Sequence, residues 1–212
     1  MSGSPIEWTY WDLDWHDGGN PTDEEFVDPT KGRMWQPWMR LPDAMFHRMT
    51  WGAPIQDWDD AIVADSDDDF PIEDFPYAHE APIASQRAME LIERLAPGCV
   101  QFLPVIMTHN RKPMRVGRYW VMNVVTTVDC LEPEPGTTTP LPERIGKHMP
   151  ADNVQLERSR TRFIRKAIPS DVPLFRMRRE YLTVIARDDI RRAFEDLQIT
   201  GCLFKPLPFQ IV

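Results

Sequence analysis

The side chains that could carry acid–base, nucleophilic or metal chemistry are the histidines, the three cysteines and the 33 aspartates and glutamates. A phosphate-binding loop around Gly146-Lys147 is excluded for two reasons. The glycine that must come five residues before Gly146 is replaced by Leu141, and the Ser or Thr that would bind magnesium is replaced by His148. A calcium loop that begins at Asp65 is excluded, because Phe70 occupies the position of the obligatory turn glycine. The zinc deaminase, serine hydrolase and zinc protease patterns are also absent from the sequence. These failures predict a protein that is not an enzyme and needs no cofactor.

Two looser groupings leave an alternative open, an enzyme of unrecognised family that uses Asp and His groups. Asp12, Asp14 and His16 could meet around a metal with Asp17, but alternate residues share one face of any strand for purely geometric reasons. Cys99 could pair with a histidine as a nucleophile, but it follows a predicted helix whose C-terminal dipole disfavours a thiolate. We expect a solvated strand face and a buried structural thiol, with no metal site. The histidines are His16, His47, His79, His109 and His148.

Charge is distributed unevenly along the 212 residues. The net charge is −9, but residues 1–80 contain 19 Asp and Glu against 4 Lys and Arg, whereas residues 81–212 contain 14 against 20. The two parts therefore carry −15 and +6, an asymmetry that concerns partners and steering rather than fold. Either the acidic half attracts a cationic partner, or it neutralises the basic half within the folded molecule.

A basic cluster near residue 160 is the best case for a nucleic-acid-binding module. The low isoelectric point, about 5.0, and the acidic half argue against it, because a protein that binds phosphates presents a dominant basic surface. We expect the cluster to pair within the molecule with the acidic residues of Asp65–Asp74, and we predict no nucleic-acid partner. The cluster consists of Arg158, Arg160, Arg162, Arg165 and Lys166.

The first 80 residues combine acid, proline and seven of the eight tryptophans. Trp11, Leu13 and Trp15 alternate with Asp12 and Asp14, which is the period of a half-buried strand. No run of 18 apolar residues and no secretory leader is present, so we expect a cytoplasmic protein without a membrane partner. The cysteines, Cys99, Cys130 and Cys202, are odd in number and widely spaced, which predicts buried free thiols.

Regular elements are clearer beyond residue 80. Ser85 is a predicted N-cap for a helix that ends before Pro97-Gly98, and Asp188 is a predicted cap for a second helix with the same apolar spacing. Pro104 restricts its strand to a sheet edge or a bulge. We predict a single α+β domain over residues 1–212, with a mainly antiparallel sheet, two principal helices and an irregular, acidic, Trp-rich half (1–80) over the core (81–212). The predicted strands are Val100–Met107, Tyr119–Val128, Arg158–Lys166, Tyr181–Ala186 and Cys202–Lys205, with an exposed excursion over Leu131–Pro150.

Several short runs in the second half resemble immunity protein family eleven, a family of bacterial polymorphic-toxin immunity proteins of myxobacterial type. The resemblance covers about residues 65–208 and rests mainly on scaffold positions, and it supplies no catalytic residue. The runs are Ile83-Ala84-Ser85 through Leu95, Gln101–Val105, Tyr119–Val124 with Asp129, Phe175-Arg176, and Ile199-Thr200-Gly201 before Phe204, with Asp69-Phe70 upstream.

The resemblance implies an immunity protein that binds and neutralises a cognate antibacterial toxin domain, encoded nearby, in the cytoplasm of the producing cell. We expect no small-molecule ligand. The acidic, aromatic-studded segment Asp57–Asp74 suits capture of a basic partner, with Trp58 as an apolar anchor. The predicted toxin-binding residues are Asp57, Trp58, Asp59, Asp60, Asp65, Asp67, Asp68 and Asp69.

Overall fold

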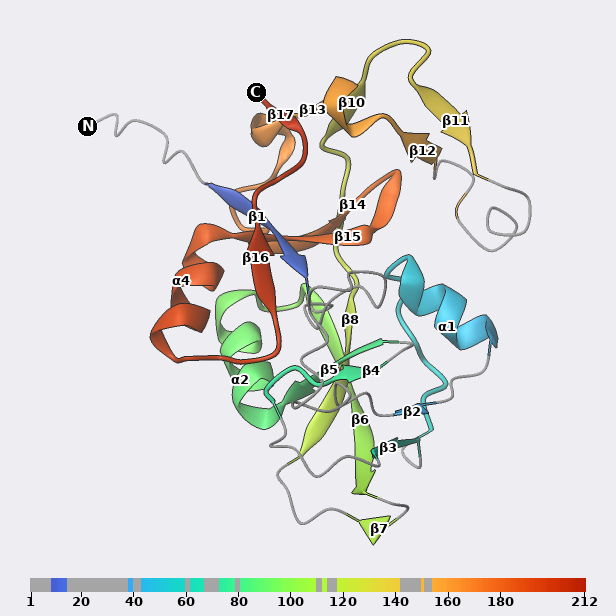
Figure 1. Ribbon diagram of the computed structural model, residues 1–212, viewed down its shortest axis with the longest axis vertical. Helices are drawn as coiled ribbons and strands as arrows, with labels where there is room; N and C mark the ends of the chain where they lie inside the picture. The colour runs from blue at the N-terminus through green and yellow to red at the C-terminus, as the bar shows by residue number, and fades with distance from the viewer. Residues whose placement is uncertain are drawn as a thin grey trace, which may run out of the picture.

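The computed structural model contains three α-helices and two main β-sheets in its described part (Figure 1). It describes residues 9–14, 38–39, 43–59, 62–66, 73–78, 81–109, 112–113, 118–141, 150 and 154–212. The architecture is α+β with mixed, largely antiparallel sheets, as the sequence predicted.

The first sheet has the strand order β2-β3-β6-β8-β5-β4, with β7 paired to β6. Its neighbouring strands are antiparallel except for β3 and β6, which run parallel with Val63 opposite Ile106. The predicted strands Val100–Met107 and Tyr119–Val128 therefore meet as the antiparallel pair β6 and β8. The strands are β2 (Trp38–Met39), β3 (Val63–Ser66), β4 (Tyr77–Ala78), β5 (Ala81–Ser85), β6 (Val100–His109), β7 (Lys112–Pro113) and β8 (Tyr119–Val124).

The second sheet has the order β16-β1-β15-β14-β9. All neighbours are antiparallel except β14 and β9, which run parallel. The predicted strands around Leu13, Tyr181–Ala186 and Cys202–Lys205 are confirmed here. The strands are β1 (Tyr10–Asp14), β9 (Thr127–Val128), β14 (Leu174–Met177), β15 (Glu180–Arg187) and β16 (Leu203–Lys205).

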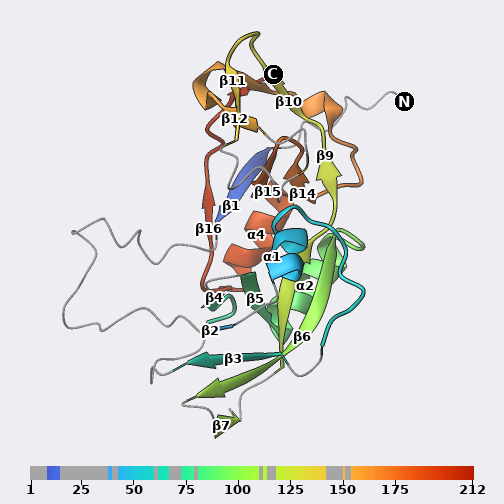
Figure 2. The same ribbon diagram turned by 90° about the vertical axis from the view of Figure 1, so that its right-hand side faces the viewer.

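Short pairings extend the fold beyond the second sheet, at the end of the molecule opposite to β3, β6 and β7 (Figures 1 and 2). Strands β10 (Leu131–Pro133), β13 (Thr161–Phe163) and β17 (Gln210–Ile211) form one small sheet. Strands β11 (Thr138–Pro140) and β12 (Val154–Leu156) form another, so the predicted excursion over Leu131–Pro150 includes paired strands.

Helix α2 (Gln86–Leu95) begins where the sequence predicts. The Ala88 amide donates to Ser85 Oγ at 3.2 Å, which satisfies one of the amides that lack a partner in the first turn. Its buried residues, Ala88, Leu91 and Ile92, lie on the predicted apolar face. Ser85 is therefore confirmed as the N-cap.

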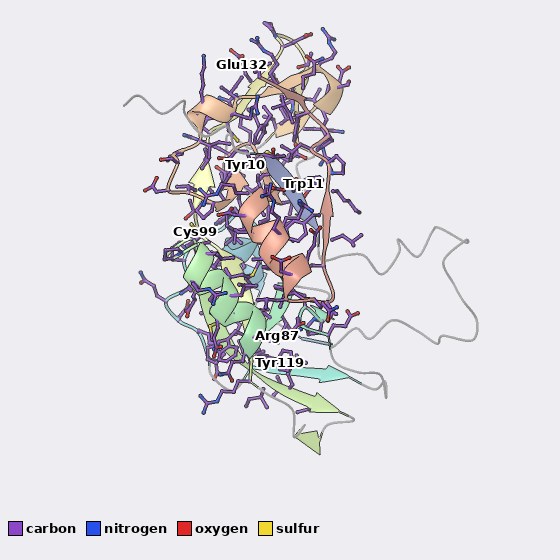
Figure 3. All side chains as sticks on the ribbon, turned by 90° about the vertical axis from the view of Figure 1, so that its left-hand side faces the viewer. Tyr10, Trp11, Arg87, Cys99, Tyr119 and Glu132 are labelled. Atoms are coloured by element: carbon purple, nitrogen blue, oxygen red, sulfur yellow. The ribbon has the colours of Figure 1, made fainter. Side chains whose placement is uncertain are left out.

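Helix α4 (Asp188–Asp196) corrects the second cap prediction. Arg187 occupies the cap position and makes no side-chain cap bond, while Asp188 is the first helical residue. The Asp188 carboxylate instead accepts hydrogen bonds from Trp11 Nε1 (2.9 Å) and Arg191 Nε (2.7 Å). The Arg191 guanidinium also stacks on the Trp11 ring, 4.9 Å from its centroid, so β1 and α4 are fixed to each other (Figure 3).

Two strand predictions were wrong. The predicted strand Tyr119–Val128 is split, because the amides of Val125 and Thr126 donate to the Cys99 carbonyl and the chain then passes to the second sheet as β9. The predicted strand Arg158–Lys166 is only Thr161–Phe163, flanked by the 3-10 turns Arg158–Arg160 and Arg165–Ala167. The first segment satisfies its backbone groups through the distant Cys99 carbonyl and the second through local turns, and apolar periodicity shows neither arrangement.

One hydrophobic core contains residues of both sheets. It combines Leu13 of β1 and Val184 of β15 with Met122 of β8, and it is sealed by Phe75 stacked on Phe194 of α4 at 5.7 Å. Helix α2 covers the first sheet on this side, and helix α1 (Asp43–Thr50) covers the opposite face with Met45 and Met49. The N-terminal half thus contributes β1, α1, β2 and β3 to the fold, rather than lying over it as an irregular wrap.

Candidate interaction site

The described part of the predicted toxin-binding segment is the connection between α1 and β3. Asp57, Trp58 and Asp59 lie in the loop, and Asp65 pairs in the backbone register with Thr108 of β6. The Ile62 amide donates to the Asp59 carbonyl at 3.0 Å, which turns the chain into β3. Asp60, Asp67, Asp68 and Asp69 lie outside the described residues.

Trp58 is held against the first sheet. Its indole Nε1 donates to the Pro104 carbonyl at 2.8 Å, and its ring packs on the core under α1 while part of it stays exposed. Pro104 pairs with Trp120 of β8 on one side only, because β3 begins further along β6, opposite Ile106. The missing proline amide therefore faces the part of β6 that β3 does not reach, and the Pro104 carbonyl there accepts the hydrogen bond from Trp58. The prediction of an edge strand or a bulge was wrong, because β6 lies between β3 and β8 in the sheet.

The carboxylates beside Trp58 are exposed. Arg48 Nη2 donates to Asp57 Oδ1 at 2.6 Å, and this hydrogen bond lowers the pKa of Asp57 below its ordinary value. The Asp57 side chain is 67 % exposed in spite of this pairing, and Asp59 is also exposed. The loop thus presents two carboxylates and a half-buried indole on one short stretch.

Two side-chain amides, one buried and one partly buried, bond to the start of this loop. Gln101 on β6 bonds to both backbone groups of Ile55, accepting from its amide at 2.9 Å and donating to its carbonyl at 2.6 Å. Asn123 on β8 donates to the Ala53 carbonyl at 2.9 Å. Because these hydrogen bonds already order the loop, less conformational entropy is lost when a partner binds to it.

The far end of the acidic segment is internal. Asp74 is buried and accepts hydrogen bonds from Arg87, from Ser85 Oγ at 2.7 Å and from the Thr200 amide at 3.1 Å. Burial alone would raise the pKa of Asp74, but these hydrogen bonds outweigh burial and hold the pKa below its ordinary value. Arg87 also donates to the Leu197 and Gln198 carbonyls at the end of α4. Asp74 therefore joins α2 to α4 (Figure 3 labels Arg87 at the exposed end of this network).

The basic cluster near residue 160 pairs with glutamates, so the predicted partners were wrong. Arg162 bonds to Glu132, its register partner across β13 and β10, and Arg160 bonds to Glu134 at 2.8 Å. Arg158 bonds to Glu180 of β15. Neighbouring strands supply these carboxylates directly, whereas Asp74 is engaged by Arg87. Arg158, Arg160 and Arg162 are thus paired locally, although each side chain stays about half exposed.

The structure describes only some of the groups that were considered for metal binding or nucleophilic catalysis. Asp12 lies in β1, while His16 and Asp17 lie outside the described residues. The three cysteines are free, and Cys99 and Cys130 are buried, as predicted. Burial raises the pKa of both Cys130 and Cys202 to about 12. Both thiols are therefore poor nucleophiles at neutral pH.

Sequence reasoning missed a buried arginine that fixes the loop after α1. Arg176 of β14 donates to the Val124 carbonyl at 3.1 Å and to the Tyr181 carbonyl at 2.7 Å, and burial lowers its pKa to about 10. Gly52, with φ of 75°, lies directly against its side chain and the Val124 carbonyl, where a Cβ would collide. The available signal was the set of polar positions within the family resemblance. Asn123 and Arg176 of this set are buried, and Gln101 is partly buried.

The comparison with protein families decides the identity. The model of the Immunity protein family (Imm11) matches residues 38–207, most of the chain. The chain belongs to this immunity protein family. Membership implies an immunity function against a toxin. The match begins at residue 38, so it includes α1, the acidic loop and β3, which the resemblance over residues 65–208 left largely outside.

Two further findings accompany the family assignment. A search of the curated proteins found no match. Within the described ranges, this immunity-family chain contains no helix that is both long and apolar enough to cross a membrane.

Proposed function

We propose that this immunity-family protein binds a cognate antibacterial toxin domain directly and neutralises it in the cytoplasm of the producing cell. Family membership carries the proposal. The net charge of −15 over residues 1–80 supports it, because an acidic surface accelerates encounter with a basic toxin domain. In this proposal the toxin domain is encoded near the immunity protein, and the complex contains neither nucleic acid nor a small molecule.

The proposed contact surface is the segment Asp57–Asp74 up to, but not including, the buried Asp74. Two observations support it: the exposure of Asp57 and Asp59, and the partial exposure of the Trp58 ring. Carboxylates at the rim chiefly raise the association rate, whereas a desolvated aromatic contributes to the lifetime of the complex. The protein acts as a stoichiometric inhibitor rather than as an enzyme.

The test is copurification and calorimetry with the toxin domain encoded beside the gene, used as a catalytically inactive variant. We expect a stoichiometric, tight complex, and protection of cells that express the active toxin domain. The proposal of direct binding would be wrong if the purified proteins do not associate although the immunity gene still protects the cells.

A further inference from the structure

Helix α2 is too short to cover the sheet on which it packs. Ten residues of α-helix span about 15 Å, whereas the ten residues of β6 span about 33 Å. The helix buries the beginning of β6 and its neighbours, with Phe102, Met122 and Ala84 in the core beneath it. Beyond Phe102, the described residues place no helix over the same face of β6.

The uncovered part of this face is apolar. Pro104 and Ile106 follow Phe102 at two-residue steps along β6, and Val63 lies directly opposite Ile106 on β3. Ile106 is 44 % exposed and Val63 is 41 % exposed, whereas Ala64 and Met107, on the other face, are buried. Trp120 lies opposite Pro104 on β8 and is partly exposed. We call Val63, Pro104, Ile106 and Trp120 the open face.

The acidic loop reaches the same edge of β6 as the open face. Trp58 donates its indole hydrogen to the Pro104 carbonyl at this edge, while its ring packs on the opposite face of the sheet, under α1. The chain enters β3 through the turn closed by the Asp59 carbonyl, four residues before Val63. Seven aspartates lie within six residues of Val63 in the sequence. Figure 2 shows β3 and the far part of β6 at the end of the molecule away from α4 and the small sheets.

From this arrangement we propose that the open face is the apolar centre of the toxin-binding surface, and that its occupant is a toxin domain with an apolar patch surrounded by basic side chains. An apolar centre with a charged rim is the usual anatomy of a protein–protein interface. The exposed carboxylates of Asp57 and Asp59, in the loop that leads to β3, supply acidic groups beside this centre, which selects a basic partner. The inference rests on the proposed function and adds the residues that the toxin domain covers.

The experiment measures binding kinetics of the inactive toxin domain to full-length immunity protein. Ile106→Arg introduces a charge that the basic partner would repel and that an apolar patch cannot solvate. We expect its affinity to fall at least tenfold, mainly through faster dissociation. Leu182→Arg is the matched control, because Leu182 is 71 % exposed on β15 of the second sheet, and its affinity should stay within twofold of wild type.

Thermal unfolding is measured for every variant, and Ile106→Ser and Val63→Ser provide milder changes if the arginine variant does not fold. We expect each serine variant to lose at least threefold in affinity. If folded variants at Val63 and Ile106 bind like wild type, the open face is not the contact surface, although the proposed function stands. If wild type itself does not bind the toxin domain, the proposed function fails and the inference fails with it.

Discussion

Among single residues, Asp74 gathers three partner residues around one buried carboxylate. It is the last aspartate of the acidic segment, but it is buried and engages Arg87, Ser85 and Thr200. The neighbouring Gly201, with φ of 83°, lies so close to the Phe75 backbone that a Cβ would collide there. The segment before β4 is therefore fixed by a charged contact and a steric one.

Asp74→Asn should lower the free energy of unfolding at pH 7 by about 2 kcal/mol, because hydrogen bonds to a charged group contribute about 1.5–3 kcal/mol each and the amide retains some of them. The folded-state pKa of Asp74 is depressed, so its contribution is present above the unfolded pKa, about 3.9, and is lost as pH falls through the folded value. Urea unfolding between pH 7 and pH 2 measures this. The difference between wild type and Asp74→Asn should shrink below about pH 4.

Asp171→Asn is the control for this experiment, because Asp171 is exposed. It should leave the free energy of unfolding within about 0.5 kcal/mol of wild type. A wild-type to Asp74→Asn difference that stays constant down to pH 2 would contradict the role assigned to the Asp74 carboxylate.

Cys130 and Cys202 should be nearly inert in the folded protein. Burial raises the pKa of each thiol to about 12, so little thiolate exists at pH 8. Alkylation by iodoacetamide, followed by mass spectrometry of the intact protein, should label neither residue in native buffer and both in urea. Rapid native labelling of Cys130 would show that its strand opens readily.

At the scale of elements, the sequence predicted those helices and strands whose position depends on contacts between residues close together in the chain. Ser85 and the apolar spacing through Leu95 placed α2, because the cap and the buried stripe lie within one segment. Pro104 wrongly indicated an edge strand or a bulge, because β6 lies inside the sheet and is unpaired only locally, where β3 has not yet begun. Asp188 misled, because its carboxylate is used by Trp11, a residue 177 positions away that no local pattern reveals.

The same distinction explains what was predicted of the candidate site. The acidic loop and Trp58 stand out in the sequence by composition, whereas the open face requires the parallel pairing of β3 with β6. Val63 and Ile106 are ordinary apolar residues until that pairing sets them side by side beyond the reach of α2. The arginine cluster was assigned to the wrong carboxylates for the same reason, since strand register selects Glu132 for Arg162.

Trp58 should show both a packing role and a contact role, which two substitutions separate. Trp58→Phe keeps most of the ring and loses the bond to Pro104, so we expect a loss of about 1 kcal/mol in unfolding free energy. Trp58→Ala should cost about 3 kcal/mol, reduced by its partial exposure, and should weaken toxin binding further. Chemical unfolding and a cell-protection assay measure the two effects. A folded Trp58→Ala protein that protects fully would rule out the anchor role.

At the scale of the whole molecule, the charges separate into a neutralised part and an acidic part. Arg158, Arg160 and Arg162 form ion pairs with glutamates from residues 132–180. These ion pairs do not involve the carboxylates of residues 1–80. Of the carboxylates of residues 1–80, Asp57 pairs with Arg48 and Asp74 pairs with Arg87. We propose that the net negative charge of residues 1–80 attracts an external partner.

Replacing Asp67, Asp68 and Asp69 together by Asn removes three negative charges beside β3 and tests that proposal. If this net charge steers a basic toxin domain, the association rate should fall about tenfold at low salt while the dissociation rate and the melting temperature stay nearly unchanged. The difference should shrink as ionic strength rises, because the Debye length falls to about 3 Å at 1 M salt. Stopped-flow binding at several salt concentrations and calorimetric melting measure both quantities. The opposite pattern, a lowered melting temperature with unchanged association, would mean that these aspartates pair within the molecule and that recognition of the toxin domain depends on the apolar surface alone.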